Sequence, residues 1–213
     1  RRIAFGKWLN VGQTCVAPDY LLVDARVHDE LLDLIKEEVH RMFGEHPLDN
    51  EDYGHIVNAK HFARVRGLID PDKVVLGGAA RETSLKIEPT ILDGVTPEDA
   101  VMQEEIFGPI LPVLTFESLD EAETFITDRP TPLALYIFSQ DRAVQQRFVR
   151  YVPFGGGCVN DTIMHLATSH MGFGGMGASG MGQYHGRESF DTFSHKKSCL
   201  LYTSPSPRDM RRS

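Results

Sequence analysis

Cys15 follows Gly12, Gln13 and Thr14 directly, in a chain with three cysteines. A thiol can attack a carbonyl carbon, but only its thiolate is strongly nucleophilic, so a reactive cysteine needs backbone amides, a helix N-terminus or a base nearby. Gly12 lets the backbone approach a ligand closely, and a turn before Cys15 could present that residue's own amide to an oxyanion. Free cysteines are also among the most buried residue types. Cys15 alone therefore fits either a nucleophile or a small buried hydrophobe.

A second candidate is Glu105, which follows Glu104 and precedes Phe107 by two positions. A carboxylate accepts two hydrogen bonds at once, which suits the neighbouring hydroxyls of a ribose. On its own, such a glutamate pair is more typical of a solvated turn.

Residues 175–180, GMGASG, match the dinucleotide-binding pattern GxGxxG. That fingerprint requires a preceding strand, a following helix and an acidic residue about 20 positions later. Residues 181–190 show no convincing amphipathic helix, so we predict a glycine-rich loop rather than a dinucleotide site.

The remaining metal-ligating residue types suggest no metal site. The cysteines are odd in number, far apart and without CxxC spacing, which argues against a disulfide framework and a zinc site and fits a reducing cytoplasm. The later histidines show neither helical i, i+4 pairing nor a fixed acidic companion. These histidines are His165, His170, His185 and His195.

Length and composition describe an ordinary globular chain. Its 213 residues allow one large domain or two small ones, and the fractions of 41% apolar and 24% charged residues are typical of soluble proteins. No apolar run approaches the roughly 20 residues of a membrane helix, so we expect no transmembrane segment. The formal net charge of -8 repels phosphate backbones, so nucleic acid is not an expected partner.

Hydrophobic periodicity predicts the elements that position these residues. An apolar strand at 20–23 precedes a helix that should end at Gly44, and a second helix is expected within 50–70, before a strand at 73–78. From residue 109 onward, strands and helices alternate, and Ser118 with Glu121 predicts a capping box at the first of these helices. The predicted segments are strand 109–116, helix 118–128, strand 133–139, helix 140–152 and strand 155–160. This order predicts an α/β fold with a mainly parallel sheet and helices on both faces.

Several motifs occur in the order and approximate spacing of the aldehyde dehydrogenase superfamily, over about residues 1–200. They are FGKWLNVGQTCVAPDYLLV, PTILDGVTPEDAVMQEEIFGPILPVLTF, PLALYIFS, GGGCVNDTIMHLATS and FGGMGASGMGQYHGRESFDTFSHKKSC. The ending YHGRESFDTFSHKKSC resembles the class 3 branch in particular. The chain is thus similar to the C-terminal, catalytic-domain portion of a class 3-like enzyme.

The resemblance implies a role for each candidate. Cys15 matches the nucleophile, which attacks an aldehyde to form a thiohemiacetal; hydride then passes to the nicotinamide of NAD or NADP, and water hydrolyses the thioester to a carboxylic acid. The carbonyl oxygen would be held in part by the backbone amide of Cys15. Glu105 matches the residue that hydrogen-bonds the nicotinamide ribose, and Phe107 the one beside the nicotinamide.

The same resemblance places Asn160, Thr162 and His165 in the segment that borders the aldehyde pocket. From the residues alone, hydrogen bonding within a loop is the more common role for Asn160, and an ordinary polar contact is the more common role for His165.

The resemblance also suggests a domain plan. Residues 1–189 would form the catalytic domain, 190–202 a C-terminal strand used in a homodimer, and 203–213 a linker, a disordered tail or added sequence. Only 14 residues precede Cys15, whereas the family's coenzyme domain, general-base glutamate and oxyanion asparagine lie upstream of the nucleophile. We therefore expect the chain alone to be inactive as a dehydrogenase. A cysteine-dependent esterase or acyltransferase and a non-catalytic interaction protein are the alternatives.

Overall fold

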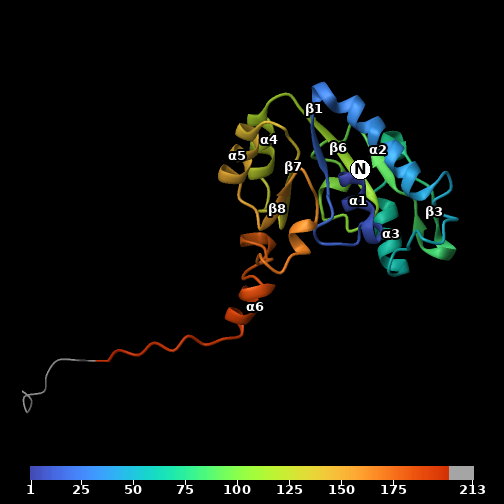
Figure 1. The fold of residues 1–213 in the computed structure, drawn as a ribbon. Helices are drawn as coiled ribbons and strands as arrows, with labels where there is room; N and C mark the ends of the chain where they lie inside the picture. Colours follow the sequence, from blue (N-terminus) through green and yellow to red (C-terminus); the bar gives the residue numbers. More distant parts are fainter. Residues whose placement is uncertain (202–213) are drawn as a thin grey trace, which may run out of the picture.

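The computed structural model describes residues 1–201, and a four-stranded sheet forms its centre (Figure 1). The strand order is β1, β6, β5, β2. Both β1 and β5 run parallel to β6, whereas β2 is antiparallel to β5. The strands are β1 (Leu21–Asp24), β6 (Ile110–Phe116), β5 (Thr90–Leu92) and β2 (Val74–Leu76).

Helices cover both faces of this sheet, because side chains alternate along β6. Leu111 and Val113 pack into a core with α1 (Arg2–Trp8) and α2 (His28–Phe43). Ile110 and Leu114 point to the opposite face and pack with α3 (Ala59–Gly67). The predicted α/β class is confirmed.

A second layer follows β6. Helices α4 (Leu119–Thr127) and α5 (Arg142–Tyr151) enclose a small core with β7 (Ala134–Ile137), and β7 pairs in parallel with β8 (Gly156–Val159). β7 and β8 form a separate two-stranded parallel sheet, so the strands after residue 116 do not extend the central sheet. Leu22 and Phe116 of the central sheet pack against this second core, so side chains join the layers.

Local hydrogen bonds explain where helices begin. Ser118 Oγ accepts from Glu121 N at 3.2 Å, as the capping box requires, but the Glu121 carboxylate accepts from Glu117 N at 2.9 Å, one residue before the cap. Asn58 caps α3 by accepting from His61 N, so that helix is shorter than predicted.

The remaining elements of the body are short. Ala80–Arg81 (β3) and Lys86–Ile87 (β4) pair as an antiparallel hairpin. Single 3₁₀ turns occur at Leu9–Gly12, Ala25–Val27, Pro71–Lys73, Glu82–Ser84, Ala100–Met102, Met164–Leu166 and Gly177–Ser179. Within residues 1–201, no helix has the length and apolar character needed to cross a membrane.

In the C-terminal part, residues 175–180 form the predicted loop. A short helix, α6 (Gly186–Thr192), follows it, in which Ser189 Oγ accepts from His185 N and no side chain is buried. Of the segment predicted as a dimer strand, 190–192 belong to α6, and 193–201 pair with no strand of the described chain.

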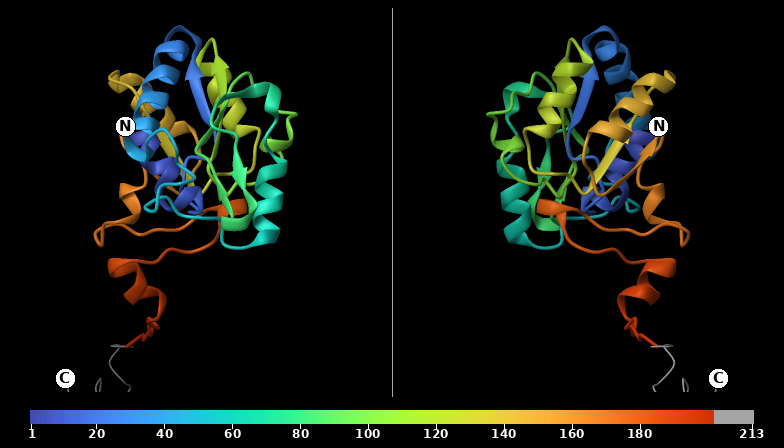
Figure 2. Two further views of the ribbon diagram at one scale, coloured as in Figure 1. Left: turned by 90° about the vertical axis from the view of Figure 1, so that its right-hand side faces the viewer. Right: turned by 90° about the vertical axis from the view of Figure 1, so that its left-hand side faces the viewer.

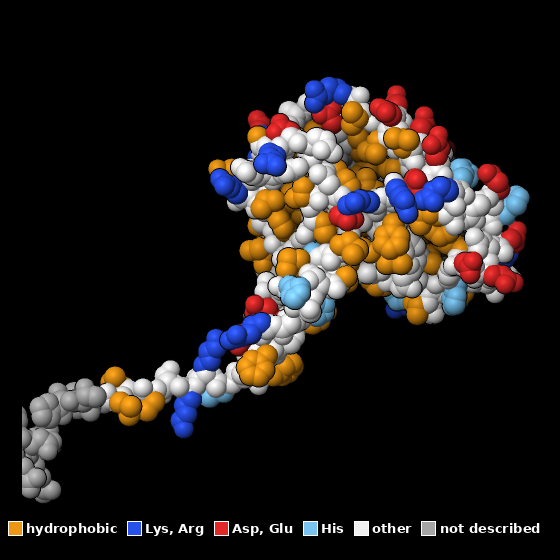
Figure 3. All heavy atoms as spheres, in the orientation of Figure 1, with side chains coloured by type: hydrophobic (Ala, Val, Ile, Leu, Met, Phe, Trp, Pro, Cys, Tyr) orange, Lys and Arg blue, Asp and Glu red, His pale blue; other side chains and the backbone are white. Residues whose placement is uncertain are grey.

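The segment from α6 to residue 201, called the arm below, extends away from the rest of the molecule (Figures 1 and 2). Apolar side chains lie along it (Figure 3), among them the exposed residues Phe190, Phe193, Leu200 and Leu201. A strand that joins a partner's sheet needs that partner, so the dimer role of the arm stays a prediction. The tail predicted at 203–213 lies outside the described residues.

Candidate functional site

The segment between α1 and Cys15 folds back against the loop that carries Glu105. Trp8, at the end of α1, donates from its buried Nε1 to Pro109 O at 2.9 Å. Asn10, Val11 and Gly12 then have φ values of 52°, 59° and 72°. Three consecutive left-handed residues cost free energy that the surrounding contacts must offset. The result is a tight reversal directly before the cysteine.

Gly12 is required by space as well as by φ. An ideal Cβ on Gly12 would lie 2.2 Å from Gly108 O, far inside contact distance. The backbone before Cys15 therefore packs on the backbone that follows Phe107.

Gln13 fixes the other side of the turn. Its Nε2 donates to His55 O at 3.0 Å, and its Oε1 accepts from Val57 N at 3.0 Å. Both ends of the amide are thus used in structure rather than in chemistry.

Cys15 lies exposed at the tip of a turn closed by the hydrogen bond from Ala17 N to Thr14 O, 2.9 Å. Its neighbour Val16, 1% exposed, occupies the apolar position instead. Within residues 1–201, the Cys15 amide has no hydrogen-bond acceptor. This geometry argues against the small buried hydrophobe and leaves both the thiol and its amide available to a ligand.

The loop that carries Glu105 is held through the backbone of Ile106. Asp19 Oδ1 accepts from Ile106 N at 3.0 Å. Arg64 of α3 donates to Ile106 O at 2.6 Å and to Glu105 O at 3.2 Å. Glu105 and Phe107, on either side, are exposed, and Phe107 has a φ of 46°. The structure thus places both predicted cofactor-binding residues on a loop that contacts residues 7–19. Because this stretch contains Cys15, the candidate nucleophile, it is called the nucleophile segment below.

Electrostatics tie these groups together. Lys7 is 1% exposed, and burial lowers its pKa to about 8 although Asp19 and Glu105 oppose the shift. Partial burial and then the Asp19 charge raise the pKa of Glu105, against Arg64 and Lys7. Glu105, the predicted ribose-binding residue, therefore lies near the buried ammonium of Lys7, the carboxylate of Asp19 and the guanidinium of Arg64.

Asn160 and Thr162 make structural contacts. The Asn160 carboxamide donates to Ser139 O at 3.0 Å and accepts from Ser139 N at 2.9 Å, which joins the ends of β8 and β7. Thr162 is 1% exposed and donates from Oγ1 to Arg2 O at 2.9 Å. These contacts give both side chains a role in the fold, and a pocket role for either residue stays a prediction.

His165 contacts the segment after Cys15 indirectly, through Tyr136. It is buried, its Nδ1 is 3.6 Å from Cys158 Sγ, and its Nε2 has no partner within residues 1–201. Burial lowers the pKa of His165, which favours a neutral ring. That ring packs edge-on against Tyr136, whose hydroxyl donates to Val16 O at 2.6 Å. Tyr136 thus links His165 to the backbone of Val16, next to Cys15, while the His165 imidazole lies beside the Cys158 thiol.

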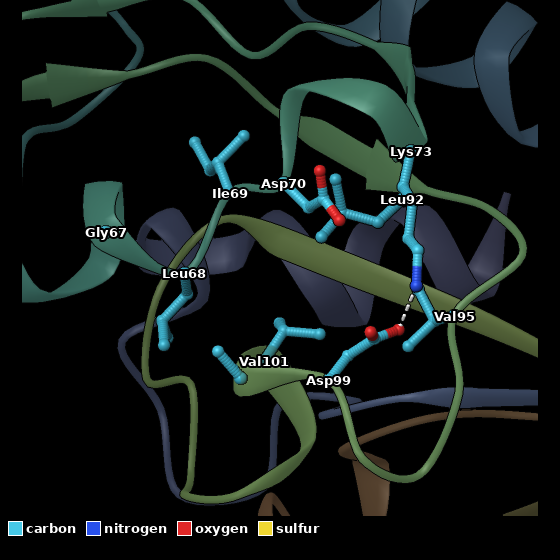
Figure 4. Close-up of a pocket in the computed structure, with 10 residues that line it drawn as sticks. Gly67, Leu68, Ile69, Asp70, Lys73, Leu92, Val95, Asp99 and Val101 are labelled. Carbon is cyan, nitrogen blue, oxygen red and sulfur yellow. Dashed lines mark hydrogen bonds and ion pairs between the residues drawn. The ribbon is translucent and has the colours of Figure 1, made fainter.

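One cavity lies away from these residues. This cavity, of about 120 Å³, lies beside α3 and is lined by Leu68, Leu92 and Val101, with the Lys73–Asp99 ion pair at its edge (Figure 4). It contains none of the predicted site residues. Within the described residues, no group of three or more metal-ligating side chains occurs.

Comparison with known proteins agrees with this arrangement. Residues 1–199 match the family model described as "Aldehyde dehydrogenase family". The chain belongs to this family. Mammalian relatives include a rat protein named "Aldehyde dehydrogenase family 3 member A2", 48% identical over 94% of this chain and 42% of its own length, which confirms the class 3 resemblance.

Two further relatives and one structure give the extent of the match. The "4,4'-diaponeurosporen-aldehyde dehydrogenase" of Staphylococcus aureus is 53% identical over 94% of this chain and 44% of its own length. The Bos taurus "Aldehyde dehydrogenase, dimeric NADP-preferring" is 48% identical over 94% of this chain and 84% of its own length. The structure titled "Substrate bound state of Staphylococcus Aureus AldH" superposes with a TM-score of 0.90 at 48% identity, covering 99% of this chain and 48% of that one. The chain thus spans about half of the Staphylococcus aureus relative.

Sequence reasoning missed Lys7, Asp19 and Arg64. Lys7 was visible only as a charge within an apolar run, and no pattern singled out Asp19 or Arg64. The contact from Asp19 to Ile106 spans 87 positions and the contact from Arg64 to Ile106 spans 42, which no local pattern reports.

Proposed function

We propose that this chain carries the nucleophile and the nicotinamide end of the coenzyme site of an NAD(P)-dependent aldehyde dehydrogenase. The observation that supports this most is the exposed Cys15, with a free amide among the described residues, on a segment packed against the loop of the exposed Glu105 and Phe107. The segment that carries Cys15 thus packs against the loop of Glu105, the residue proposed to bind the ribose. Hydride transfer needs the thiol and the nicotinamide end of the coenzyme to be close together.

The residues present fit such a coenzyme. Glu105 is an exposed carboxylate that can accept from two ribose hydroxyls, and Phe107, 41% exposed, offers an apolar face beside it. When bound, the nicotinamide supplies a hydride acceptor.

The chain's own groups would act in sequence. The Cys15 thiolate forms a bond to the carbonyl carbon of the aldehyde, and the electron pair of the C=O bond moves to oxygen, where the Cys15 amide donates to it. The electron pair on oxygen then re-forms the C=O bond, giving a thioester, while the C–H bond breaks and its hydride would pass to the oxidised nicotinamide of NAD or NADP. Hydrolysis of that thioester releases a carboxylic acid and returns the Cys15 thiol.

The remaining features of the complete protein are part of this proposal. The relative named "dimeric NADP-preferring" supports a homodimer that uses NADP or NAD. Most of the coenzyme would be held by residues outside this chain, which covers only 44% of the Staphylococcus aureus relative. An aldehyde, as a small-molecule substrate of open chain length, would be oxidised, and a reducing cytoplasm would be the location.

Thiol labelling of the isolated chain tests the nucleophile directly. Cys15 and Cys199 are both exposed, so Cys199 serves as an internal control for a thiol without special surroundings. We expect iodoacetamide to modify Cys15 about tenfold faster than Cys199, measured by peptide mass spectrometry. The same chain should produce no reduced coenzyme from an aldehyde with NAD or NADP. Equal labelling rates would favour a non-catalytic interaction protein.

In the full-length protein, Glu105→Gln is expected to weaken coenzyme binding and slow hydride transfer. The amide keeps the size of the side chain but loses the charge-assisted hydrogen bonds to the ribose, which costs on the order of 1 to 3 kcal/mol. Glu98→Gln is the matched control, because this exposed carboxylate makes no hydrogen bond or ion pair within the described residues. Unchanged turnover number and coenzyme affinity in Glu105→Gln would show that Glu105 belongs to a solvated turn.

A further inference from the structure

Three contacts join the nucleophile segment to the loop around Glu105. Trp8 reaches Pro109, and Gly12 packs on Gly108. The third contact, from Asp19 to the amide of Ile106, has a charged side chain as its acceptor. Asp19 lies four residues after Cys15, so this hydrogen bond spans directly from the nucleophile turn to the residue between the two predicted cofactor ligands.

We propose that Asp19 is a positioning residue of the dehydrogenase reaction, which holds the Glu105–Phe107 segment at a fixed place relative to Cys15. Arg64 forms the other half of the clamp. This inference rests on the proposed function, and it assigns to Asp19 no contact with substrate or coenzyme.

The clamp acts on one residue, Ile106. Asp19 holds its N–H at 3.0 Å, and Arg64 holds its C=O at 2.6 Å. The Ile106 side chain is completely buried, so the residue is fixed on three sides. Glu105 and Phe107 flank this anchor and are both exposed. A buried anchor between two exposed residues is the arrangement that presents a carboxylate and an aromatic ring together.

The strained backbone of Phe107 explains why this loop needs the hydrogen bonds from Asp19 and Arg64. Phe107 has a φ of 46°, a conformation that non-glycine residues seldom adopt and that costs free energy. Without the hydrogen bonds that hold Ile106, Phe107 would relax toward a negative φ, and its ring would turn away from its present position. Asp19 and Arg64 therefore stabilise the strained conformation through the peptide groups next to it.

Asp19 also acts on Glu105 through charge. The charged groups that face Glu105 are Lys7 of α1, Asp19 of the nucleophile turn and Arg64 of α3. Because the Asp19 charge raises the pKa of Glu105, neutralising Asp19 should lower that pKa. Coenzyme affinity that depends on ionised Glu105 falls as pH drops through this pKa. Without the Asp19 charge, the fall should occur at lower pH.

Two substitutions in the full-length enzyme separate these effects. Asp19→Asn removes the charge but keeps an oxygen that can accept from Ile106 N, whereas Asp19→Ala removes the acceptor. We expect Asp19→Ala to raise the KM for coenzyme and lower kcat, each by on the order of tenfold, and Asp19→Asn to stay within about threefold at neutral pH. In both variants, the acid limb of coenzyme binding should move to lower pH.

A matched control removes a similar bond elsewhere. Asp24 Oδ1 accepts from Arg26 N at 3.0 Å at the end of β1. Asp24→Ala should lower thermal stability without changing the coenzyme KM or the acid limb. If Asp24→Ala shifts them as Asp19→Ala does, or if Asp19→Asn and Asp19→Ala are equally impaired at neutral pH, the clamp is overturned.

A measurement without catalysis keeps this test apart from the proposed function. The Ile106 amide should be protected from hydrogen exchange in the wild type and in Asp19→Asn, and should lose protection in Asp19→Ala. If the wild type oxidises no aldehyde, the proposed function fails, while the exchange result still judges the clamp. Unchanged protection in Asp19→Ala overturns it.

Discussion

Cys15→Ala in the full-length protein is expected to reduce aldehyde oxidation by at least about a thousandfold, because the proposed covalent bond to the carbonyl carbon can no longer form at this position. Coenzyme binding should be nearly unchanged, since Cys15 lies exposed at the tip of its turn and the proposed ribose-binding residue belongs to another loop. Cys15→Ser should fail similarly, because a hydroxyl is far less readily ionised than a thiol and is a weaker nucleophile. Steady-state rates and coenzyme titration measure both effects.

The other two cysteines provide controls. Cys158 is partly buried beside His165, and Cys199 lies in the exposed arm. Cys158→Ala and Cys199→Ala should each leave oxidation close to the wild-type rate. Oxidation by Cys15→Ala within tenfold of the wild type would contradict the assignment of the nucleophile.

The second large effect is expected from Gly12→Ala. The new Cβ would meet Gly108 O at 2.2 Å, and the φ of 72° is itself unfavourable for alanine. The backbone of either segment must move, so we expect a loss of about 3 kcal/mol or more in the free energy of unfolding. Urea denaturation measures the loss, and oxidation should fall further because Cys15 and Glu105 no longer keep their spacing.

Gly94→Ala separates the clash from the strain. Gly94 has a φ of 64° but no atom within 4 Å of an ideal Cβ. Its substitution should cost only about 1 to 2 kcal/mol. If both variants lose the same free energy, the contact between Gly12 and Gly108 has no energetic weight.

Local signals predicted much of this molecule. The helix α2 and its end at Gly44 follow from apolar spacing and a residue suited to positive φ. The class of fold followed from the alternation of strands and helices after residue 109. Cys15, Glu105 and Phe107 became candidate site residues because the motifs that contain them resemble those of a known family.

What the sequence did not reveal depends on distant contacts. The separation of β7 and β8 from the central sheet depends on how α4 and α5 pack, and nothing in those strands encodes it. Likewise, the contact from Asp19 to Ile106 joins segments that share no sequence pattern. Helix α6 was missed because most of its side chains are polar or exposed, so it lacks an apolar period.

The close approach of Gly12 to Gly108 also has a consequence for recombining related enzymes. A chimera that takes one of these loops from one parent and the second from another must reproduce a backbone fit that neither parent's side chains can adjust. Segments 7–19 and 105–109 should therefore be inherited together in any library of family hybrids, although they are distant in the gene. A crossover point between them would separate two segments whose backbones must fit each other closely.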